Sequence, residues 1–328
     1  MATPIHTTQQ GQVAPESHPG DKYDIPSYEA PDSLSALKDR IKKHYEIASD
    51  YYYSLWGQHI HHGYFKSPTE TKEQAQVNLI DYLLEISALP DGSRVLDVGC
   101  GVGGTTRFLA KEHDCQVTGI TISGRQVEIA KRLTLAETST EGEDSSGFFA
   151  YSKGKARFIE LDAEKMAEYF AAQAAPSAQV DCVWISEALS HLPNKPLFFS
   201  SSFSLVASGG RLVIADWFKA PGLTTEQVDA DIKPIEDGML LPRLFTSDEY
   251  VAMAKEAGFK LRGEPIDISK DVAKTWDISW SLVSSPSLWA FAISQGRDGL
   301  AFLQAFRAMR RGYANGTFRY AIMSFEKP

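Results

Sequence analysis

The stretch "RVLDVGCGVGGTTRFLA" at residues 94–110 decides the fold of this chain. Its first residues form a short apolar run that is typical of a buried strand, and the residues after the glycines have helical spacing. Gly99, Gly101 and Gly104 lie between them in the pattern Gly-x-Gly-x-x-Gly. This pattern alone also occurs in tight turns that only need close packing. Its position between a strand and a helix favours a cofactor-binding turn.

The same alternation of strand and helix continues along the chain. Strand-like runs follow at 116–123, 156–163, 180–186 and 211–217, and the helical pattern before the last of these is expected to extend to Gly209. Two closing strands are expected at 259–269 and 319–327, after a capping box formed by Thr246 and Glu249. These features predict an α/β fold with a doubly wound, Rossmann-like, seven-stranded, mostly parallel sheet and helices on both faces.

The composition divides the chain into four segments. Residues 1–31 are rich in Thr, Gln, Pro and Gly, which predicts a flexible tail. Residues 32–90 contain two amphipathic helical patterns, the first capped by Ser33, and are expected to form an N-terminal helical lid. Residues 91–218 are expected to form the Rossmann-like, cofactor-binding core, and residues 219–328 an inserted, acceptor-binding helical cap with the closing strands. A polar stretch at 136–155 is expected to be a surface insertion without a core.

Charge and cysteine content limit the classes of function. The 33 basic and 42 acidic side chains give a net charge of −9, which argues against a protein that binds duplex nucleic acid, since such a protein needs a basic face; no nucleic-acid partner is expected. The 3 cysteines have no CxxC spacing, as is usual in a reducing compartment. We find no signal peptide and no run long enough to span a bilayer. A cytoplasmic protein without stable membrane insertion is therefore expected.

Two features near the glycine turn indicate which cofactor it binds. Asp97 precedes Gly99 by two residues, where its carboxylate would repel a pyrophosphate but accommodate an ammonium or sulfonium. A nicotinamide site also needs an acidic residue about 20 positions later, and the second strand ends in "GITIS" without one. S-adenosyl-L-methionine is thus favoured over NAD.

Several motifs together resemble a known family. "VLDVGCGVGGTTRFLA", "VTGITISGRQVEIA", "LDAEKM", "SHLPNK" and "LVASGGRLVIADW" occur in this order. They resemble class I S-adenosylmethionine-dependent methyltransferases. "GITIS..Q", "LWGQHIHHGYF" and "GTFRYAIMSFEK" look most like the branch of gamma-tocopherol C-methyltransferases and alkaloid N-methyltransferases, and more distantly like cyclopropane fatty acid synthases. The resemblance covers about residues 33–327 and is weakest between 219 and 319.

The resemblance implies a set of cofactor contacts. Gly99 and Gly101 should admit the methionine part, Thr121 and Gln126 should replace the usual ribose-binding acid, and Asp162 with the backbone N–H of Ala163 should bind adenine. Ser186, at the end of the fourth strand, belongs to the same expected set. Two of these residues have alternative explanations, because Gln126 can complete a capping box with Ser123 and Asp162 can be a helix N-cap.

Methyl transfer is an in-line displacement that mainly requires alignment of the acceptor with the methyl group. A base is needed only where the acceptor must lose a proton. In "SEALSHLP", Glu187 and His191 stand four residues apart, so one helical turn would bring them to one face. His191 is the base that the sequence favours, because the usual pKa of histidine is near neutrality. A histidine that merely packs or caps a turn is the alternative.

The stretch "LWGQHIHHGYF" at residues 55–65 has three histidines in four positions, His59, His61 and His62. A metal site would need further ligands, and no cysteine or carboxylate cluster follows at ligand spacing, so no metal is expected. The family resemblance instead places the segment across the mouth of the cofactor site. There Gly63 would allow close approach, and His61 or Tyr64 would donate a hydrogen bond.

The acceptor should be a small molecule. Residues 219–316 are rich in aromatic and long apolar side chains, which indicates a hydrophobic or aromatic acceptor in a biosynthetic, secondary-metabolic pathway. That set comprises Met239, Leu240, Leu241, Trp276, Trp280, Trp289, Phe291, Phe306 and Tyr313. Two alternatives remain open, namely a cofactor-bound cyclase or scaffold that does not methylate, and an NAD-dependent oxidoreductase. A homodimer is compatible with the sequence.

Overall fold

The computed structural model describes residues 38–43, 45, 46, 49, 53, 56–138, 142–173, 179–282, 293 and 297–328. The expected tail at 1–31 and the expected cap Ser33 lie outside these residues, as do Trp289 and Phe291. The side chain of Trp280 is likewise not described.

The centre of the fold is an eight-stranded sheet with the order β3-β4-β2-β1-β5-β6-β8-β7. The strands β1, β2, β4, β5 and β6 are parallel, whereas β3 runs antiparallel to β4, and β8 runs antiparallel to both β6 and β7. The topological switch point lies between β1 and β5. The bounds are β1 Arg94–Val98, β2 Gln116–Thr121, β3 Phe149–Ala150, β4 Lys155–Glu160, β5 Val180–Ser186, β6 Val206–Lys219, β7 Lys260–Asp267 and β8 Phe318–Glu326.

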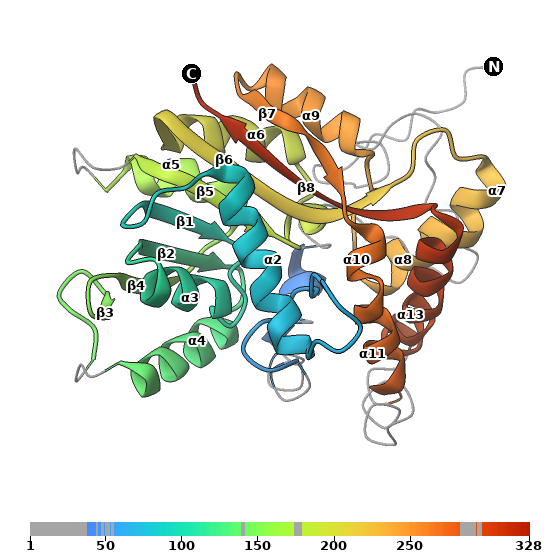
Figure 1. Ribbon diagram of the computed structural model, residues 1–328, viewed down its shortest axis with the longest axis horizontal. Helices are drawn as coiled ribbons and strands as arrows, with labels where there is room; N and C mark the ends of the chain where they lie inside the picture. The colour runs from blue at the N-terminus through green and yellow to red at the C-terminus, as the bar shows by residue number, and fades with distance from the viewer. Residues whose placement is uncertain are drawn as a thin grey trace, which may run out of the picture.

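Helices cover both faces of the sheet, as Figure 1 shows. Successive strand residues point to opposite faces, so Val213 packs in one apolar cluster and Leu212 in the other. The first face is covered by α2 (Lys72–Ser87), α3 (Gly104–Glu112) and α4 (Gly124–Glu137). The second is covered by α5 (Met166–Ala171), α6 (Lys195–Leu205) and α9 (Ser247–Glu256). The doubly wound α/β prediction is therefore confirmed.

The strand count of seven was wrong by one, because the polar insertion contains an additional strand. β3 pairs with β4, and this brings Phe148 and Phe149 into the core, where each is 4% exposed. The predicted end of α6 was also wrong. Val206 already pairs with Val180, and Gly209 and Gly210 exchange backbone hydrogen bonds with Lys327 at 2.7 and 3.0 Å. These bonds recruit the residues after Leu205 into the sheet and end the helix.

The cap lies at one end of the sheet, beyond β6 and β8 (Figure 1). It consists of α7 (Thr225–Gln227), the π-helix η3 (Val228–Ile232), α8 (Lys233–Gly238), α10 (Ser269–Val272), α11 (Lys274–Leu282) and α13 (Arg297–Asn315). The predicted capping box of Thr246 and Glu249 begins α9. None of the helices that the structure describes is long and apolar enough to cross a membrane.

The N-terminal region divides into two parts. We expected α2 to belong to the lid, but its Leu79, Ile80 and Leu83 are at most 1% exposed and pack in the core against the sheet. The segment before α2 is the part that reaches the cavity. Its Gly63 N–H donates to Thr275 Oγ1 of α11 at 3.1 Å, so the segment connects core and cap.

Candidate active site

A cavity opens at the carboxyl ends of β1, β2, β4 and β5, next to the topological switch point, where open α/β sheets bind their ligands. The N-terminal segment and the cap close its other sides. Its walls include Lys38, Tyr45, His61, His62, Asp97, Gly99, Gly101, Thr121, Gln126, Asp162, Ala163, Ser186, Glu187, His191, Trp217, Met239, Thr275, Trp276 and Phe306. Every predicted site residue except Tyr64 therefore lines one cavity.

The glycine turn after β1 has a left-handed backbone conformation that residues with a side chain rarely adopt. Gly99 has φ +75° and Gly101 has φ +55°. A Cβ on Gly99 would lie 2.2 Å from Ala188 Cβ, whereas a Cβ on Gly101 would meet no atom within 4 Å. The N–H groups of Gly99 and Cys100 both donate to the carbonyl of Ile120, at 2.9 and 3.0 Å. The turn is thus fixed to β2 and leaves open space at Gly101.

Asp97 supplies a carboxylate to the same end of the cavity. Its side chain is 3% exposed and accepts a hydrogen bond from Thr106 Oγ1 at 2.6 Å. Burial raises the pKa of Asp97 to about 6, although the bond from Thr106 acts in the opposite direction. A buried carboxylate of this kind is stabilised when a cationic group comes close to it.

Thr121 and Gln126 form one unit at the end of β2. The Thr121 hydroxyl donates to Gln126 Oε1 at 2.6 Å. Ser123 caps α4 by accepting from the Gln126 N–H at 3.2 Å, but only this half of the expected capping box is present. The Gln126 side chain is turned toward Thr121 and the cavity wall instead.

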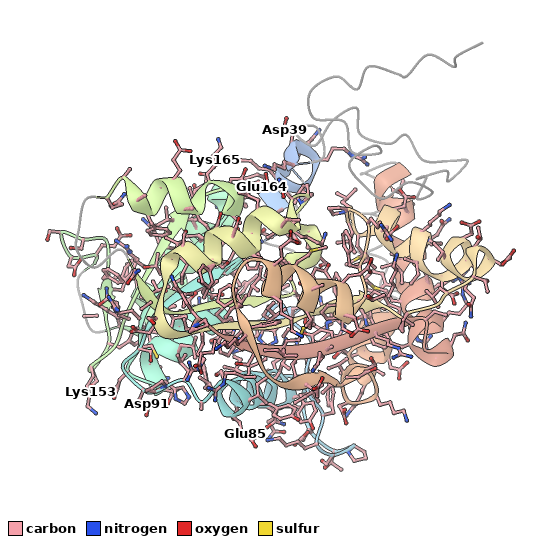
Figure 2. The ribbon with its side chains drawn as sticks, turned by 90° about the horizontal axis from the view of Figure 1, so that it is seen from above. Asp39, Glu85, Asp91, Lys153, Glu164 and Lys165 are labelled. Carbon is pink, nitrogen blue, oxygen red and sulfur yellow. The ribbon has the colours of Figure 1, made fainter. Side chains whose placement is uncertain are left out.

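Asp162 has the helix N-cap role that the sequence left open, and it also lies at the cavity, where the expected contact with adenine would require it. It is the N-cap of the 3₁₀ turn η1 (Ala163–Lys165), accepting from the Glu164 N–H at 3.0 Å, and it also lines the cavity. Lys38 of the N-terminal helix pairs with Asp162 at 3.0 Å and also with Glu164. Figure 2 shows the neighbouring Asp39 on the same side of the molecule as Glu164 and Lys165. The helix is thus bound electrostatically to the rim of the cavity.

Glu187 follows β5 in a left-handed conformation with φ +54°. Its carboxylate accepts three hydrogen bonds, from His62 N at 2.6 Å, His62 Nδ1 at 2.9 Å and the Tyr320 hydroxyl at 2.9 Å. Burial pushes the pKa of Glu187 upward, but attraction to His62 and the bonds from it outweigh burial, and the net pKa is lower than usual. The expectation of one helical turn from Glu187 to His191 was wrong, because the left-handed residue breaks that turn.

His191 ends the 3₁₀ turn η2 (Leu189–His191), and its Nε2 lies 3.3 Å from the Tyr45 hydroxyl. Two buried charged groups hold this turn. Asp216 Oδ2 accepts from the Ser190 N–H at 3.0 Å, and Lys195 Nζ donates to the Leu192 carbonyl at 3.0 Å. Burial raises the pKa of Asp216 to about 6 and lowers that of Lys195 to about 8.

The histidine segment, residues 56–65, crosses the cavity and is held there by hydrogen bonds. Gln76 Nε2 donates to the carbonyls of His59 and His61 at 2.6 and 3.0 Å and fixes the segment to α2. His61 Nδ1 lies 2.8 Å from the His62 carbonyl, and burial lowers the pKa of His61. Within the part of the chain that the structure describes, no three His, Cys, Asp or Glu side chains gather as a metal would require.

Tyr64 is not among the residues that line the cavity, so the structure gives no support to its expected contact with the cofactor. Its ring stacks on Tyr82 of α2 with centroids 5.0 Å apart, and its N–H donates to the Ala75 carbonyl at 2.8 Å. Sequence reasoning missed His62, Tyr45 and Tyr320. His62 stood in the quoted segment, but adjacent histidines give no sign of which ring faces inward.

Comparison with known proteins places the chain in a family. The family model that matches is described as mycolic acid cyclopropane synthetase and aligns with residues 33–262. The chain belongs to this family. It is a class I S-adenosylmethionine-dependent methyltransferase, as its sequence relatives and their shared fold show.

Two curated relatives and one solved structure illustrate the similarity. A chloroplastic tocopherol O-methyltransferase of Arabidopsis thaliana is 26% identical over 319 residues, 90% of this chain and 84% of the relative. A 2-methyl-6-phytyl-1,4-hydroquinone methyltransferase of Synechocystis sp. is 31% identical over 276 residues, 82% and 74% of the two chains. A mycolic acid cyclopropane synthase complexed with SAH and CTAB has a TM-score of 0.71 at 19% identity, covering 88% of this chain and 98% of that one.

The raised pKa of Asp97 predicts that cofactor affinity depends on pH. An approaching ammonium or sulfonium favours the ionised carboxylate, so binding must release the proton that Asp97 holds below its pKa of about 6. Affinity should therefore fall as the pH drops below this value, by up to about tenfold per pH unit. Calorimetry at a pH below this pKa, in two buffers of different protonation enthalpy, would measure the released proton. Asp97→Asn should abolish the release, and a wild-type enthalpy independent of buffer would contradict this assignment.

Proposed function

We propose that the enzyme transfers the methyl group of S-adenosylmethionine to a small hydrophobic or aromatic metabolite at an oxygen, nitrogen or carbon atom. The observation that carries the proposal is the continuity of the cavity. One end is the glycine turn with Asp97, and the other is walled by Trp217, Met239, Trp276 and Phe306. The methyl donor and an apolar acceptor would therefore meet in one cavity, and the apolar side chains around the acceptor would help to exclude water.

We assign the cofactor contacts to the residues that line the first end. Gly101 and Gly99 would let the methionine part approach the backbone, and Asp97 would lie near its cationic groups. Thr121 with Gln126 would hold the ribose, and Asp162 with the Ala163 N–H would hold the adenine. Ser186 and His61 would complete the wall, and since His61 Nδ1 faces a carbonyl, its Nε2 presents a lone pair. Each of these residues lines the cavity, and this position supports its assignment.

The bound cofactor supplies an electrophilic methyl group with a neutral leaving thioether. The protein's part is to exclude water and to align the acceptor with the methyl–sulfur bond. The N-terminal helix and the histidine segment close the cavity, and the aromatic side chains of the cap orient the acceptor. Where the acceptor must lose a proton, the proton acceptor would be His191, which the sequence favoured, or a group that acts together with Glu187.

The relatives support this function over the alternatives. Relatives that are 26%, 30% and 31% identical to this chain are described as methyltransferases, which favours methyl transfer over a non-methylating cyclase or scaffold. The buried Asp97 and the absence of a carboxylate on β2 disfavour NAD. Absence of nucleic-acid binding, a homodimer and a cytoplasmic location stay predictions, and the Arabidopsis relative is described as chloroplastic.

A labelling experiment tests the proposal. The purified enzyme is incubated with methyl-labelled S-adenosylmethionine and fractionated small metabolites of the source, and products are identified by mass spectrometry. We expect the label in an apolar small molecule. Label in protein or nucleic acid alone would contradict the proposal, and tight cofactor binding without transfer to any fraction would favour the scaffold alternative.

A companion experiment tests the histidine segment. Chelator treatment should leave methyl transfer unchanged, because the described side chains offer no metal site. His61→Ala should weaken affinity for S-adenosylhomocysteine by about 3- to 30-fold, the loss expected for one buried hydrogen bond and its packing. Equilibrium dialysis measures the affinity. Activity that is lost to chelator and restored by a divalent metal would show that the segment binds metal after all.

A further inference from the structure

We infer that His62 is the general base of this enzyme for acceptors that must lose a proton, and that Glu187 and Tyr320 position it. This inference rests on the proposed function, since it concerns the acceptor end of the same cavity. Glu187 is then a positioning residue, and the proton of the acceptor moves to a histidine of the N-terminal segment.

The bonds around Glu187 fix the tautomer that the His62 ring has when it is neutral. Glu187 Oε2 lies 2.9 Å from His62 Nδ1, and Oε1 accepts from the Tyr320 hydroxyl at 2.9 Å and from the His62 N–H at 2.6 Å. An ionised carboxylate can only accept, so the hydrogen between Glu187 and His62 must be carried by Nδ1. Nε2 of the neutral ring then carries the lone pair.

That lone pair has no partner of its own. His62 is 3% exposed, and its Nε2 is buried without a hydrogen bond to any residue that the structure describes. An orphaned polar atom in a protein interior costs about 1–3 kcal/mol, which a ligand able to donate a hydrogen bond would offset. The ring is one wall of the cavity, so this ligand would be the acceptor.

The surroundings of His62 place it at the acceptor end. Its ring centroid lies 4.9 Å from that of Trp276, 5.1 Å from Tyr320 and 5.8 Å from Trp217. Trp217 and Trp276 line the cavity together with Met239 and Phe306. An apolar acceptor packed on these side chains would therefore bring its O–H or N–H toward the imidazole. His191 differs, because its Nε2 already faces the Tyr45 hydroxyl at 3.3 Å.

The proton transfer balances within these groups. The O–H or N–H bond of the acceptor breaks, and its proton binds to His62 Nε2. The lone pair left on the acceptor forms the bond to the methyl carbon, and the electron pair of the broken methyl–sulfur bond stays on the neutral thioether. The imidazolium, stabilised by the adjacent Glu187 carboxylate, afterwards releases its proton to solvent.

A chromophoric phenol tests this step without the natural acceptor. 4-Nitrophenol is titrated into enzyme saturated with S-adenosylhomocysteine, at a pH where the free probe is mostly the neutral phenol, and the phenolate absorption band is recorded. We expect the band to appear with the wild type and to be at least about tenfold weaker with His62→Gln. His113→Gln is the matched control, since His113 Nδ1 pairs with Asp91 at 2.9 Å outside the cavity, and it should behave as the wild type.

Different outcomes of this experiment would refute the proposed function and the proposed role of His62. Failure of the wild type to bind S-adenosylhomocysteine would refute the proposed function. Binding of the cofactor without a phenolate band, or a band that His191→Gln removes and His62→Gln retains, would overturn the inference alone. Should His62→Gln not fold, Glu187→Gln makes the same comparison, because it removes the charge that stabilises the imidazolium, and an undiminished band would again overturn it.

Discussion

Replacement of Gly101 by valine should lower the affinity for S-adenosylhomocysteine by at least about 100-fold and leave the protein folded. An ideal Cβ on Gly101 meets no atom of the protein within 4 Å, and the residue lines the cavity. The added side chain would therefore occupy space that the cofactor needs. The left-handed φ of +55° costs a side chain about 1–2 kcal/mol, which most domains of this size tolerate.

Gly92→Val is the matched control for this variant. Gly92 has φ +79° and likewise no atom within 4 Å of an added Cβ, but it does not line the cavity. Both variants should lose similar stability in urea unfolding, and only Gly101→Val should lose binding in calorimetry. Equal affinity of the two variants would show that the cofactor does not pass over the glycine turn.

The core of the fold could be predicted because its signals are local. The strand, the glycine turn and the helix of residues 94–110 are adjacent in sequence, and each later strand and helix repeats that pattern. β3 was missed since only 2 residues form it, inside a stretch whose Ser, Glu and Gly content suggested no core. Pairing with β4 outweighed this composition, because it buries Phe148 and Phe149.

The cofactor end of the site could be predicted for the same reason. Asp97, Thr121, Asp162 and Ser186 each stand at the end of a parallel strand, and such ends meet at one edge of the sheet. The acceptor end could not be predicted in this way. The bonds to Glu187 join residues 125 and 133 positions apart in the chain, and spacing gives no sign of such pairs.

The direction in which each side chain points was the second property that could not be predicted from the sequence. His61, His62 and Tyr64 are close in sequence, yet two line the cavity and the third packs on Tyr82. The expected helical spacing of Glu187 and His191 failed because Glu187 adopts a left-handed φ. A non-glycine residue in that conformation costs energy that the surrounding structure must offset, and such residues gather at functional sites. The three hydrogen bonds that Glu187 accepts are the compensation here.

Replacement of Glu187 by alanine should speed the release of S-adenosylhomocysteine by at least about tenfold, equivalent to about 1.4 kcal/mol. The His62 N–H and ring and the Tyr320 hydroxyl would lose their common acceptor, and each unpaired buried group costs about 1–3 kcal/mol. The segment that crosses the cavity would then open more often. Stopped-flow displacement of bound S-adenosylhomocysteine measures the release, and hydrogen exchange of residues 59–65 measures the opening.

Two further variants separate the two roles of Glu187, which are to hold the histidine segment closed by hydrogen bonds and to provide a negative charge. Glu187→Gln keeps an oxygen that can accept from the His62 N–H, so it should release the ligand at nearly the wild-type rate while methyl transfer falls. Glu137→Ala also removes a carboxylate that accepts from an arginine and a tyrosine hydroxyl, at 3.2 and 3.3 Å, but it lies outside the cavity. It should lower stability without faster release. If Glu187→Ala releases the ligand no faster than Glu137→Ala does, the Glu187–His62 contact does not hold the segment closed, and closure must depend on Gln76, Lys38 and the cap instead.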